Sequence, residues 1–182
     1  DGTKEFVNRN GEFTVNIALI RNHEPALGVV FVPVSGITYT GITGVGAERR
    51  AADGNGQTIS VRVPCADPLV VVGSRSHANP ALEKHLAALG DYRLVSMGSS
   101  LKFCLLAEGE ADFYPRLGPT SEWDTAAAHA VVLAAGGRIV TITGEPLRYN
   151  LKPSYLNPEF FVISDASRDW LSAFRDDGDE SA

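Results

Sequence analysis

The sequence has few cysteines and no long hydrophobic run, and each absence excludes a class of protein. Among its 182 residues only Cys65 and Cys104 are cysteines, too few for a disulfide framework or a cysteine-built zinc site. We interpret both as buried, reduced thiols of a cytoplasmic protein. The longest apolar segment, residues 126–135, is interrupted by His129 and is shorter than the ~20 residues that cross a bilayer. The opening Asp-Gly-Thr-Lys-Glu has no signal-peptide character.

Positive charge is also not in excess, because the formal net charge is -6. A surface that binds nucleic-acid polymers needs surplus lysine and arginine, so we expect no polymer partner. A small phosphorylated ligand remains compatible with this charge, since an acidic cluster that holds divalent cations would bind it. Hydrophobic residues make up 44% of the chain, enough for the core of one large or two small domains.

The first third of the chain has the patterns of β-structure. Residues 12–20 alternate between apolar and polar, which predicts a half-buried strand. A turn at residues 22–25 and strands at 26–34 and 36–43 follow. The glycines of residues 41–46 resemble a phosphate-binding loop, but no helix pattern follows them, so we interpret them as a hairpin turn.

The remainder alternates between strand and helix, which is typical of an α/β domain. Residues 69–72 form a short apolar run typical of a parallel strand covered on both faces. Further predicted strands are 92–96, 112–114, 138–141 and 160–164, and predicted helices are 81–89 (starting at Asn79-Pro80), 99–107 and 123–135. We therefore divide the chain into residues 1–65, residues 66–174 and an acidic, polar tail at 175–182 that is predicted to be disordered.

Two segments carry residue types suited to phosphate chemistry. Asp124 follows Ser121 at capping-box spacing in the first turn of a predicted helix, so it could simply cap that helix. Asp1-Gly2-Thr3 could simply be a turn. Alternatively, it offers a carboxylate, a glycine that lets backbone approach an anion, and a hydroxyl within reach of a metal-bound water.

Taken together, Asp1-Gly2-Thr3 and the downstream Trp123-Asp124-x-Ala126-Ala127 resemble the magnesium-dependent, lithium-sensitive phosphatases of the inositol monophosphatase superfamily. In that family Asp-Pro-x precedes Asp-Gly-Thr and a Glu-Glu pair lies further upstream. We therefore expect that an upstream segment, with further metal ligands, is missing from this sequence.

The resemblance narrows to the bacterial 3′(2′),5′-bisphosphate nucleotidases of sulfur assimilation and extends to about residue 164. The matching segments are residues 1–6, 10–20, 74–77, 98–104 and 114–120. It implies a layered α/β/α/β/α sugar-phosphatase sandwich, here without its N-terminal helices and first strands. Residues 1–65 would then be the remainder of an N-terminal metal-site sheet domain, and residues 66–174 the C-terminal α/β domain.

The implied activity is Mg²⁺-dependent hydrolysis of adenosine 3′,5′-bisphosphate to AMP and phosphate, with the sulfated relative of this nucleotide as a second substrate. The resemblance also implies two or three Mg²⁺ ions and a monomer or homodimer. The implied location is the cytoplasm, with peripheral association with the inner membrane as an alternative. Inositol phosphate or fructose bisphosphate are alternative substrates. A non-catalytic nucleotide-binding fragment is an alternative of another class.

The resemblance assigns the catalytic roles to the two segments described above. Asp1 would bind two Mg²⁺ ions and Asp124 one, close to the substrate. Gly2 and Thr3 would offer backbone N–H groups to the scissile phosphate, and the Thr3 hydroxyl would orient the attacking water. With only two carboxylate ligands, Mg²⁺ would be held weakly, so we predict little or no activity for residues 1–182 alone.

The resemblance assigns nucleotide binding to two further segments. Ser74 and His77 on one loop, and Gly98 and Lys102 on another, would hold the substrate, near the carboxyl end of a parallel strand where α/β folds bind ligands. As alternatives, Ser74 and His77 could cap a helix and Lys102 could be a solvated lysine. We interpret His129 as a packed or surface side chain rather than a ligand, because Mg²⁺ prefers oxygen.

Overall fold

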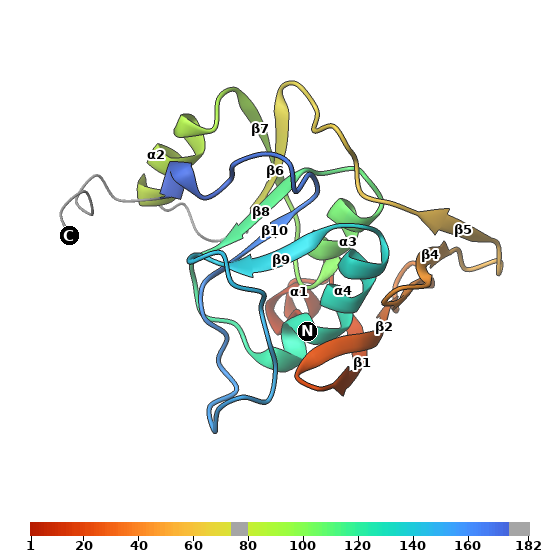
Figure 1. Cartoon of the computed structure of the whole chain (residues 1–182). Coiled ribbons are helices and arrows are strands. Elements are labelled where there is room, and N and C mark those ends of the chain that lie inside the picture. Colours follow the sequence, from red (N-terminus) through yellow and green to blue (C-terminus); the bar gives the residue numbers. More distant parts are fainter. Residues whose placement is uncertain (74–79, 175–182) are drawn as a thin grey trace.

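The computed structural model describes residues 1–73 and 80–174, and these form two β-sheets with a layer of helices between them (Figure 1). Sheet A is antiparallel, with its strands side by side in chain order. Its strands are β1 (Val15–Arg21), β2 (Glu24–Val32), β3 (Ile37–Ile42), β4 (Gly46–Arg50) and β5 (Gly56–Ile59). Exposure alternates along β1, which confirms the period-two prediction for this segment.

Tight turns join the strands of sheet A. Asn22 and His23, both with positive φ, connect β1 to β2, as the turn prediction expected. Residues 43–45 connect β3 directly to β4, so the glycines around them belong to a hairpin, and the phosphate-loop alternative is excluded. The strands β4 and β5 were not predicted, because their short, polar sequences lack a clear apolar alternation.

Sheet B is mixed and more deeply buried. Its strands are β6 (Leu69–Gly73), β7 (Tyr92–Ser96), β8 (Phe113–Arg116), β9 (Arg138–Thr141) and β10 (Phe160–Ile163), in the order β7-β6-β8-β10-β9. The predicted parallel strand β6 is parallel to both β7 and β8. Strand β10 is antiparallel to β8 and β9, and all four of its residues are buried.

The helices fill the space between the sheets and cover the far face of sheet B (Figure 1). They are α1 (Thr3–Val7), α2 (Pro80–Ala88), α3 (Leu101–Ala107), α4 (Glu122–Ala134) and the 3₁₀ helix η1 (Ser172–Phe174). Helices α3 and α4 lie between the sheets, whereas α2 and η1 pack together beyond sheet B. The described residues thus supply the β/α/β/α layers of the predicted α/β/α/β/α order. The short helix α1 was not predicted.

Two glycines let α4 lie directly on sheet A. A Cβ on Gly28 of β2 would be 2.0 Å from the Ala127 carbonyl oxygen, and one on Gly41 of β3 would be 2.5 Å from Val131 Cα. A single hydrophobic cluster consequently runs from Val30 in sheet A to Phe160 in sheet B. The division into residues 1–65 and residues 66–174 stays a prediction. Helix α4 belongs to the second of these segments but packs on the strands of the first.

One buried carboxylate fastens the segment that passes from sheet A to sheet B. Asp112, fully buried beside β8, accepts hydrogen bonds from Arg62 Nε at 2.9 Å and Arg62 Nη2 at 3.0 Å. It also accepts from the backbone N–H of Val70 at 2.8 Å and of Ala66 at 3.3 Å. Because buried charge is costly unless it is paired and hydrogen-bonded, this cluster fixes where the chain enters sheet B.

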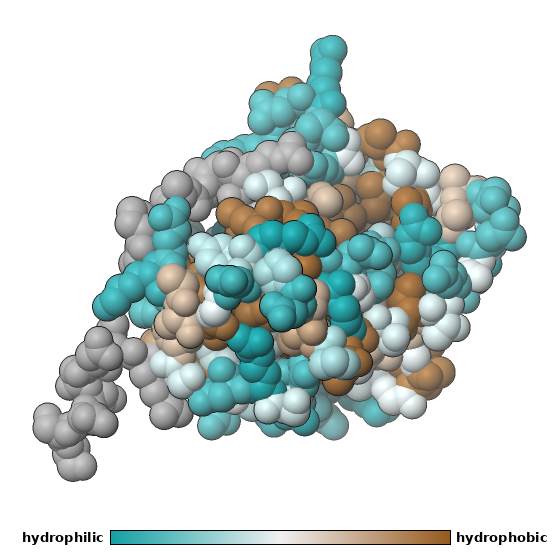
Figure 2. Space-filling model, turned by 90° about the horizontal axis from the view of Figure 1, so that it is seen from above, coloured by the Kyte–Doolittle hydropathy of each residue, from teal (hydrophilic) through white to brown (hydrophobic). Residues whose placement is uncertain are grey.

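The outer surfaces of the two sheets differ. On β1 the side chains of Val15, Ile17 and Leu19 are exposed, so this strand presents an apolar stripe on the outer face of sheet A. From above, on the side of α2 and the β6–β7 edge, hydrophobic residues form separate patches between hydrophilic ones (Figure 2). No helix in the described part of the chain has both the length and the apolar character that a bilayer crossing requires.

Candidate active site

The ends of several elements meet around a cavity of about 210 Å³. The start of the chain, the first turn of α3, the end of β8 and the first turn of α4 all contribute to it. The lining residues are Asp1, Lys4, Glu5, Ser99, Lys102, Phe103, Tyr114, Arg116, Pro119, Thr120, Asp124 and Thr125. The fold therefore brings Asp1 and Asp124, from opposite ends of the sequence, to one cavity together with Lys102.

A larger hollow of about 530 Å³ lies beside α1. Its lining is mainly apolar and contains no acidic side chain: Phe6, Val7, Arg9, Asn10, Gly11, Phe13 and Val34. This hollow offers no carboxylate, whereas Asp1, Glu5 and Asp124 line the cavity of about 210 Å³, so we take the latter as the candidate active site.

Backbone pairing positions Asp1 at the cavity. Its N–H donates to the Thr14 carbonyl at 2.8 Å, and the Thr14 N–H donates to the Asp1 carbonyl at 3.0 Å. The Thr14 hydroxyl is in turn 2.8 Å from the Ser100 hydroxyl, at the start of α3. These bonds tie Asp1 to both sheet A and α3.

Asp124 both caps α4 and lines the cavity. Its Oδ2 accepts a hydrogen bond from the Ser121 N–H at 3.1 Å, which confirms the predicted capping contact. The capping and functional interpretations of Asp124 are therefore compatible, because one carboxylate oxygen makes the cap while the side chain faces the cavity.

Asn157, in the segment before β10, also holds the start of α4 in place. Asn157 Nδ2 donates to the hydroxyls of Thr120 and Thr125, both at 3.1 Å. Behind them His129 is buried, with Nδ1 2.9 Å from the Tyr149 hydroxyl. Burial lowers the pKa of His129 from 6.5 to about 3. His129 is thus a packed histidine, as one of the two sequence interpretations stated, and its surface alternative is excluded.

Lys102 and Arg116 line the same cavity as the carboxylates. The Lys102 side chain is only 7% exposed, so the alternative of a solvated lysine is excluded. Arg116 was not singled out from the sequence, although it stands in one of the segments that carry the resemblance. Arg116 and Tyr114 are two positions apart on β8, which puts both on one face of the strand and both at the cavity. The two-residue spacing of Tyr114 and Arg116 was therefore the sequence signal that could have identified Arg116 as a site residue.

Three of the other predicted residues lie beside the cavity rather than in its lining. Gly2 has φ of 94° and precedes α1, and Thr3 is the exposed first residue of that helix. The N–H of Gly98 donates to Glu12 Oε2 at 2.6 Å. A Cβ on Gly98 would be 2.5 Å from Glu5 Cγ, so this position requires glycine for packing. Ser74 and His77 lie outside the described residues.

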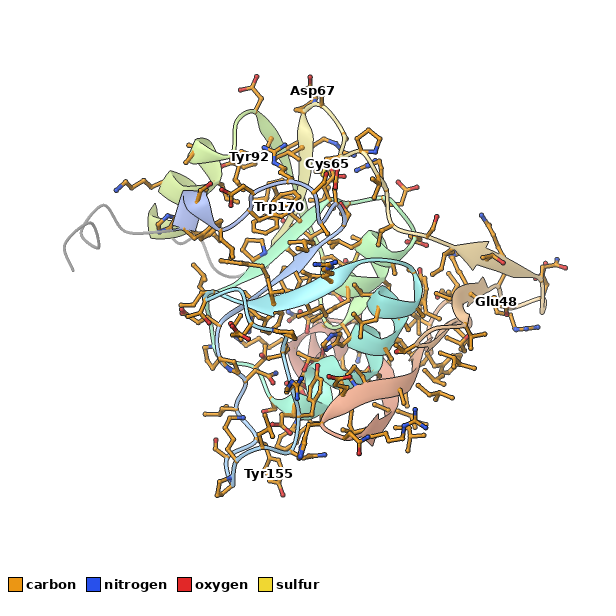
Figure 3. All side chains as sticks on the ribbon, in the orientation of Figure 1. Glu48, Cys65, Asp67, Tyr92, Tyr155 and Trp170 are labelled. Atoms are coloured by element: carbon orange, nitrogen blue, oxygen red, sulfur yellow. The ribbon has the colours of Figure 1, made fainter. Side chains whose placement is uncertain are left out.

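The cysteines are not part of the candidate site. Cys104 is buried in α3, while Cys65 is half-buried rather than buried, and neither forms a disulfide. Figure 3 places Cys65 near Trp170, at the end of the molecule opposite Tyr155. Tyr155, from the segment before β10, lies beside the first turn of α4, and its ring centroid is 5.3 Å from that of Trp123.

The donor set of the cavity fits a magnesium site only in part. Carboxylate oxygens are the ligands that Mg²⁺ prefers, and the carboxylates of Asp1, Glu5 and Asp124 line the cavity. Across residues 1–73 and 80–174, however, no three histidine, cysteine, aspartate or glutamate side chains gather as a metal site would require. The described residues alone therefore do not make a complete site.

Comparison with known proteins identifies relatives over almost the whole chain. The model of the inositol monophosphatase family matches residues 1–169. The 3′(2′),5′-bisphosphate nucleotidase CysQ of Escherichia coli K12 is 51% identical over 162 residues, which cover 89% of this chain and 64% of that protein. The Haemophilus influenzae CysQ is 34% identical over 96% of this chain and 65% of its own length.

Solved structures agree with these relatives. The crystal structure of CysQ from Bacteroides thetaiotaomicron matches with a TM-score of 0.78 and 46% identity, over 93% of this chain and 68% of that one. An inositol monophosphatase from Anabaena matches with a TM-score of 0.73 and 26% identity, over 96% of this chain and 71% of that one. The chain thus spans about 64% of the length of the first curated relative.

Proposed function

The chain belongs to the inositol monophosphatase family, and we propose that it hydrolyses the 3′-phosphate of adenosine 3′,5′-bisphosphate to give AMP and phosphate. The sulfated relative of this nucleotide is a second proposed substrate. One observation carries the proposal: Asp1 and Asp124 line a single cavity together with the cations Lys102 and Arg116. The 51% identity to the E. coli nucleotidase supports the same substrate.

In this proposal Asp1 and Asp124 are metal ligands, Asp1 to two Mg²⁺ ions and Asp124 to one. Bound Mg²⁺ would supply a water of lowered pKa and neutralise phosphate charge. The N–H groups of Gly2 and Thr3 would bind the scissile phosphate, and the Thr3 hydroxyl would orient the water. The hydrogen bonds that hold the Asp1 backbone to Thr14 and the Asp124 carboxylate to Ser121 support these roles, because they fix the Asp1 backbone and the Asp124 side chain before substrate binds.

Lys102 and Arg116 are proposed to bind the second phosphate of the nucleotide. Arginine suits this role because its planar fork of donors matches phosphate oxygens. Gly98, Ser74 and His77 complete the proposed nucleotide site. A bisphosphate suits this cavity better than an inositol monophosphate, because it places one anion at the carboxylate-bound metal and another at the cation pair. The proposed location is the cytoplasm, where the free thiols of Cys65 and Cys104 would stay reduced.

Calorimetry on residues 1–182 tests this function through binding, since two carboxylates predict little turnover. We expect adenosine 3′,5′-bisphosphate to bind at least about tenfold more tightly than AMP, because charge-assisted bonds to the second phosphate are lost in AMP. Mg²⁺ should tighten binding, and Asp124→Asn should reduce that effect. Tight binding that does not depend on Mg²⁺ would instead support a non-catalytic nucleotide-binding module. Stronger binding of inositol phosphate or fructose bisphosphate would overturn the proposed substrate.

A further inference from the structure

The amine of Lys102 is enclosed by the candidate cavity rather than solvated. Nζ donates a hydrogen bond to the Met97 carbonyl at 3.3 Å and lies 5.6 Å from the centroid of the Tyr114 ring. The ion pairs of the described residues do not include Lys102. Within residues 1–73 and 80–174, therefore, no carboxylate forms an ion pair with the Lys102 amine.

The surroundings of Lys102 also raise the fraction of its amine that is neutral. Burial is the main cause that lowers the pKa of Lys102 from 10.5 to about 8, and the charge of Arg116 lowers it further. The carboxylates of Glu5 and Glu12 oppose this shift in part. Near pH 7 roughly a tenth of the Lys102 amines would therefore be neutral and nucleophilic, far more than for an ordinary lysine.

An anion anchor lies in the same cavity. Arg116 Nε donates to the Gly118 carbonyl at 3.0 Å, and Nη2 donates to the Pro119 carbonyl at 2.7 Å. These bonds use two of the five guanidinium N–H groups and hold the side chain in place. The remaining N–H groups can bind a phosphate, which would bring the rest of a small ligand to the lysine.

We propose that Lys102 is a modification site for small phosphorylated aldehydes, which Arg116 anchors through their phosphate. The lone pair of the Lys102 nitrogen attacks the carbonyl carbon, and the resulting carbinolamine loses water to form an imine. One amine and one aldehyde give one imine and one water, so the step needs no oxidant or reductant. It goes beyond the proposed hydrolysis, because it requires neither Mg²⁺ nor turnover. Such aldehydes would occupy the nucleotide cavity reversibly.

Reductive trapping on residues 1–182 tests the proposal. The protein is incubated with pyridoxal 5′-phosphate, reduced with borohydride, and mapped by peptide mass spectrometry. We expect labelling of Lys102 at least about tenfold faster than of Lys84 and Lys152, because Lys102 combines a lowered pKa with an anion anchor in the same cavity. Lys4 lines the same cavity but is exposed, so it is the sharpest internal control. Equal labelling of all four lysines, or preferential labelling of Lys4, would overturn the proposal.

Two variants and a matched probe separate the parts of the mechanism. Lys102→Arg should abolish the fast adduct and leave slow labelling elsewhere unchanged. Arg116→Gln, checked for native circular dichroism, should slow labelling by pyridoxal phosphate about tenfold but not labelling by pyridoxal, which lacks the phosphate. If pyridoxal phosphate and pyridoxal label Lys102 equally fast in the unaltered chain, Arg116 does not anchor the phosphate. Adenosine 3′,5′-bisphosphate should protect Lys102. Fast labelling without such protection would leave the modification site standing and count against the proposed nucleotide site.

Discussion

Sheet A and sheet B support the candidate site in different ways. In sheet B the strands β6 and β10 are buried along almost their whole length, and this sheet, with α3 packed on it, supplies Arg116 and Lys102. In sheet A every second residue of β1 is exposed, and Asp1 is attached to the segment that leads into this strand. Since local stability follows buried contacts, the cation half of the site should be the more rigid half.

The largest expected change in the free energy of unfolding is at Asp112, where the chain enters sheet B. Asp112→Ala would leave Arg62 without its partner and two backbone N–H groups without an acceptor, so we expect a loss of about 3–5 kcal/mol in the free energy of unfolding. Urea denaturation measures it. The matched control is Asp53→Ala in the hairpin between β4 and β5, because the exposed Asp53 carboxylate accepts hydrogen bonds from the neighbouring Asn55. A comparable loss in both variants would contradict the contrast between the sheets.

A pH effect of slightly smaller size is expected from His129, which lies in α4 between the sheets. Burial lowers its folded-state pKa to about 3, whereas the unfolded value is near 6.5. The unfolded chain therefore binds an extra proton between these values, and stability falls as the pH drops from about 6.5 toward 3. The contribution between pH 7 and pH 4 is on the order of 3 kcal/mol. His129→Gln should flatten the dependence of the urea midpoint on pH over this range, and an unchanged slope would contradict the assignment.

At Gly28, where sheet A contacts α4, no side chain should be tolerated. Gly28→Ala would place a methyl group 2.0 Å from the Ala127 carbonyl oxygen, which must move the helix or the strand, so we expect a loss of about 2–3 kcal/mol. Gly118→Ala is the control, because its Cβ would find no atom outside its neighbours closer than 3.9 Å. Thermal melts of the two variants compare them. Equal melting temperatures would mean that α4 is not tightly seated on sheet A.

Periodicity predicted most of this fold, and the failures have physical reasons. The alternation of residues 12–20 and the apolar run at 69–72 were sufficient for β1 and β6, because one or both faces of these strands are buried. Strand β4 pairs on both sides but carries Glu48, Arg49 and Arg50, so hydrogen bonding rather than apolar pattern defines it. Helix α1, with five residues, is too short to show a helical period.

The site was predictable from the sequence only through resemblance. Nothing local indicates that Asp1 and Asp124 meet, because their approach depends on the Thr14–Ser100 hydroxyl contact and on α4 lying between the two sheets. Arg116 escaped notice because a strand-end arginine usually points to solvent. The spacing of Ser121 and Asp124 did predict the cap, since capping involves only neighbours in the sequence.

The smallest effect is expected on the outer face of sheet A. Ile17 is 62% exposed, so Ile17→Thr should change the free energy of unfolding by no more than about 0.5 kcal/mol while reducing self-association, because it interrupts an exposed apolar edge strand. Val71→Thr in β6, where the valine is 1% exposed, should cost about 1–3 kcal/mol by burying a hydroxyl. Urea denaturation and sedimentation velocity measure the two quantities. If Ile17→Thr destabilises the chain as much as Val71→Thr does, β1 is buried in solution, and Asp1 is then held as rigidly as Lys102 and Arg116.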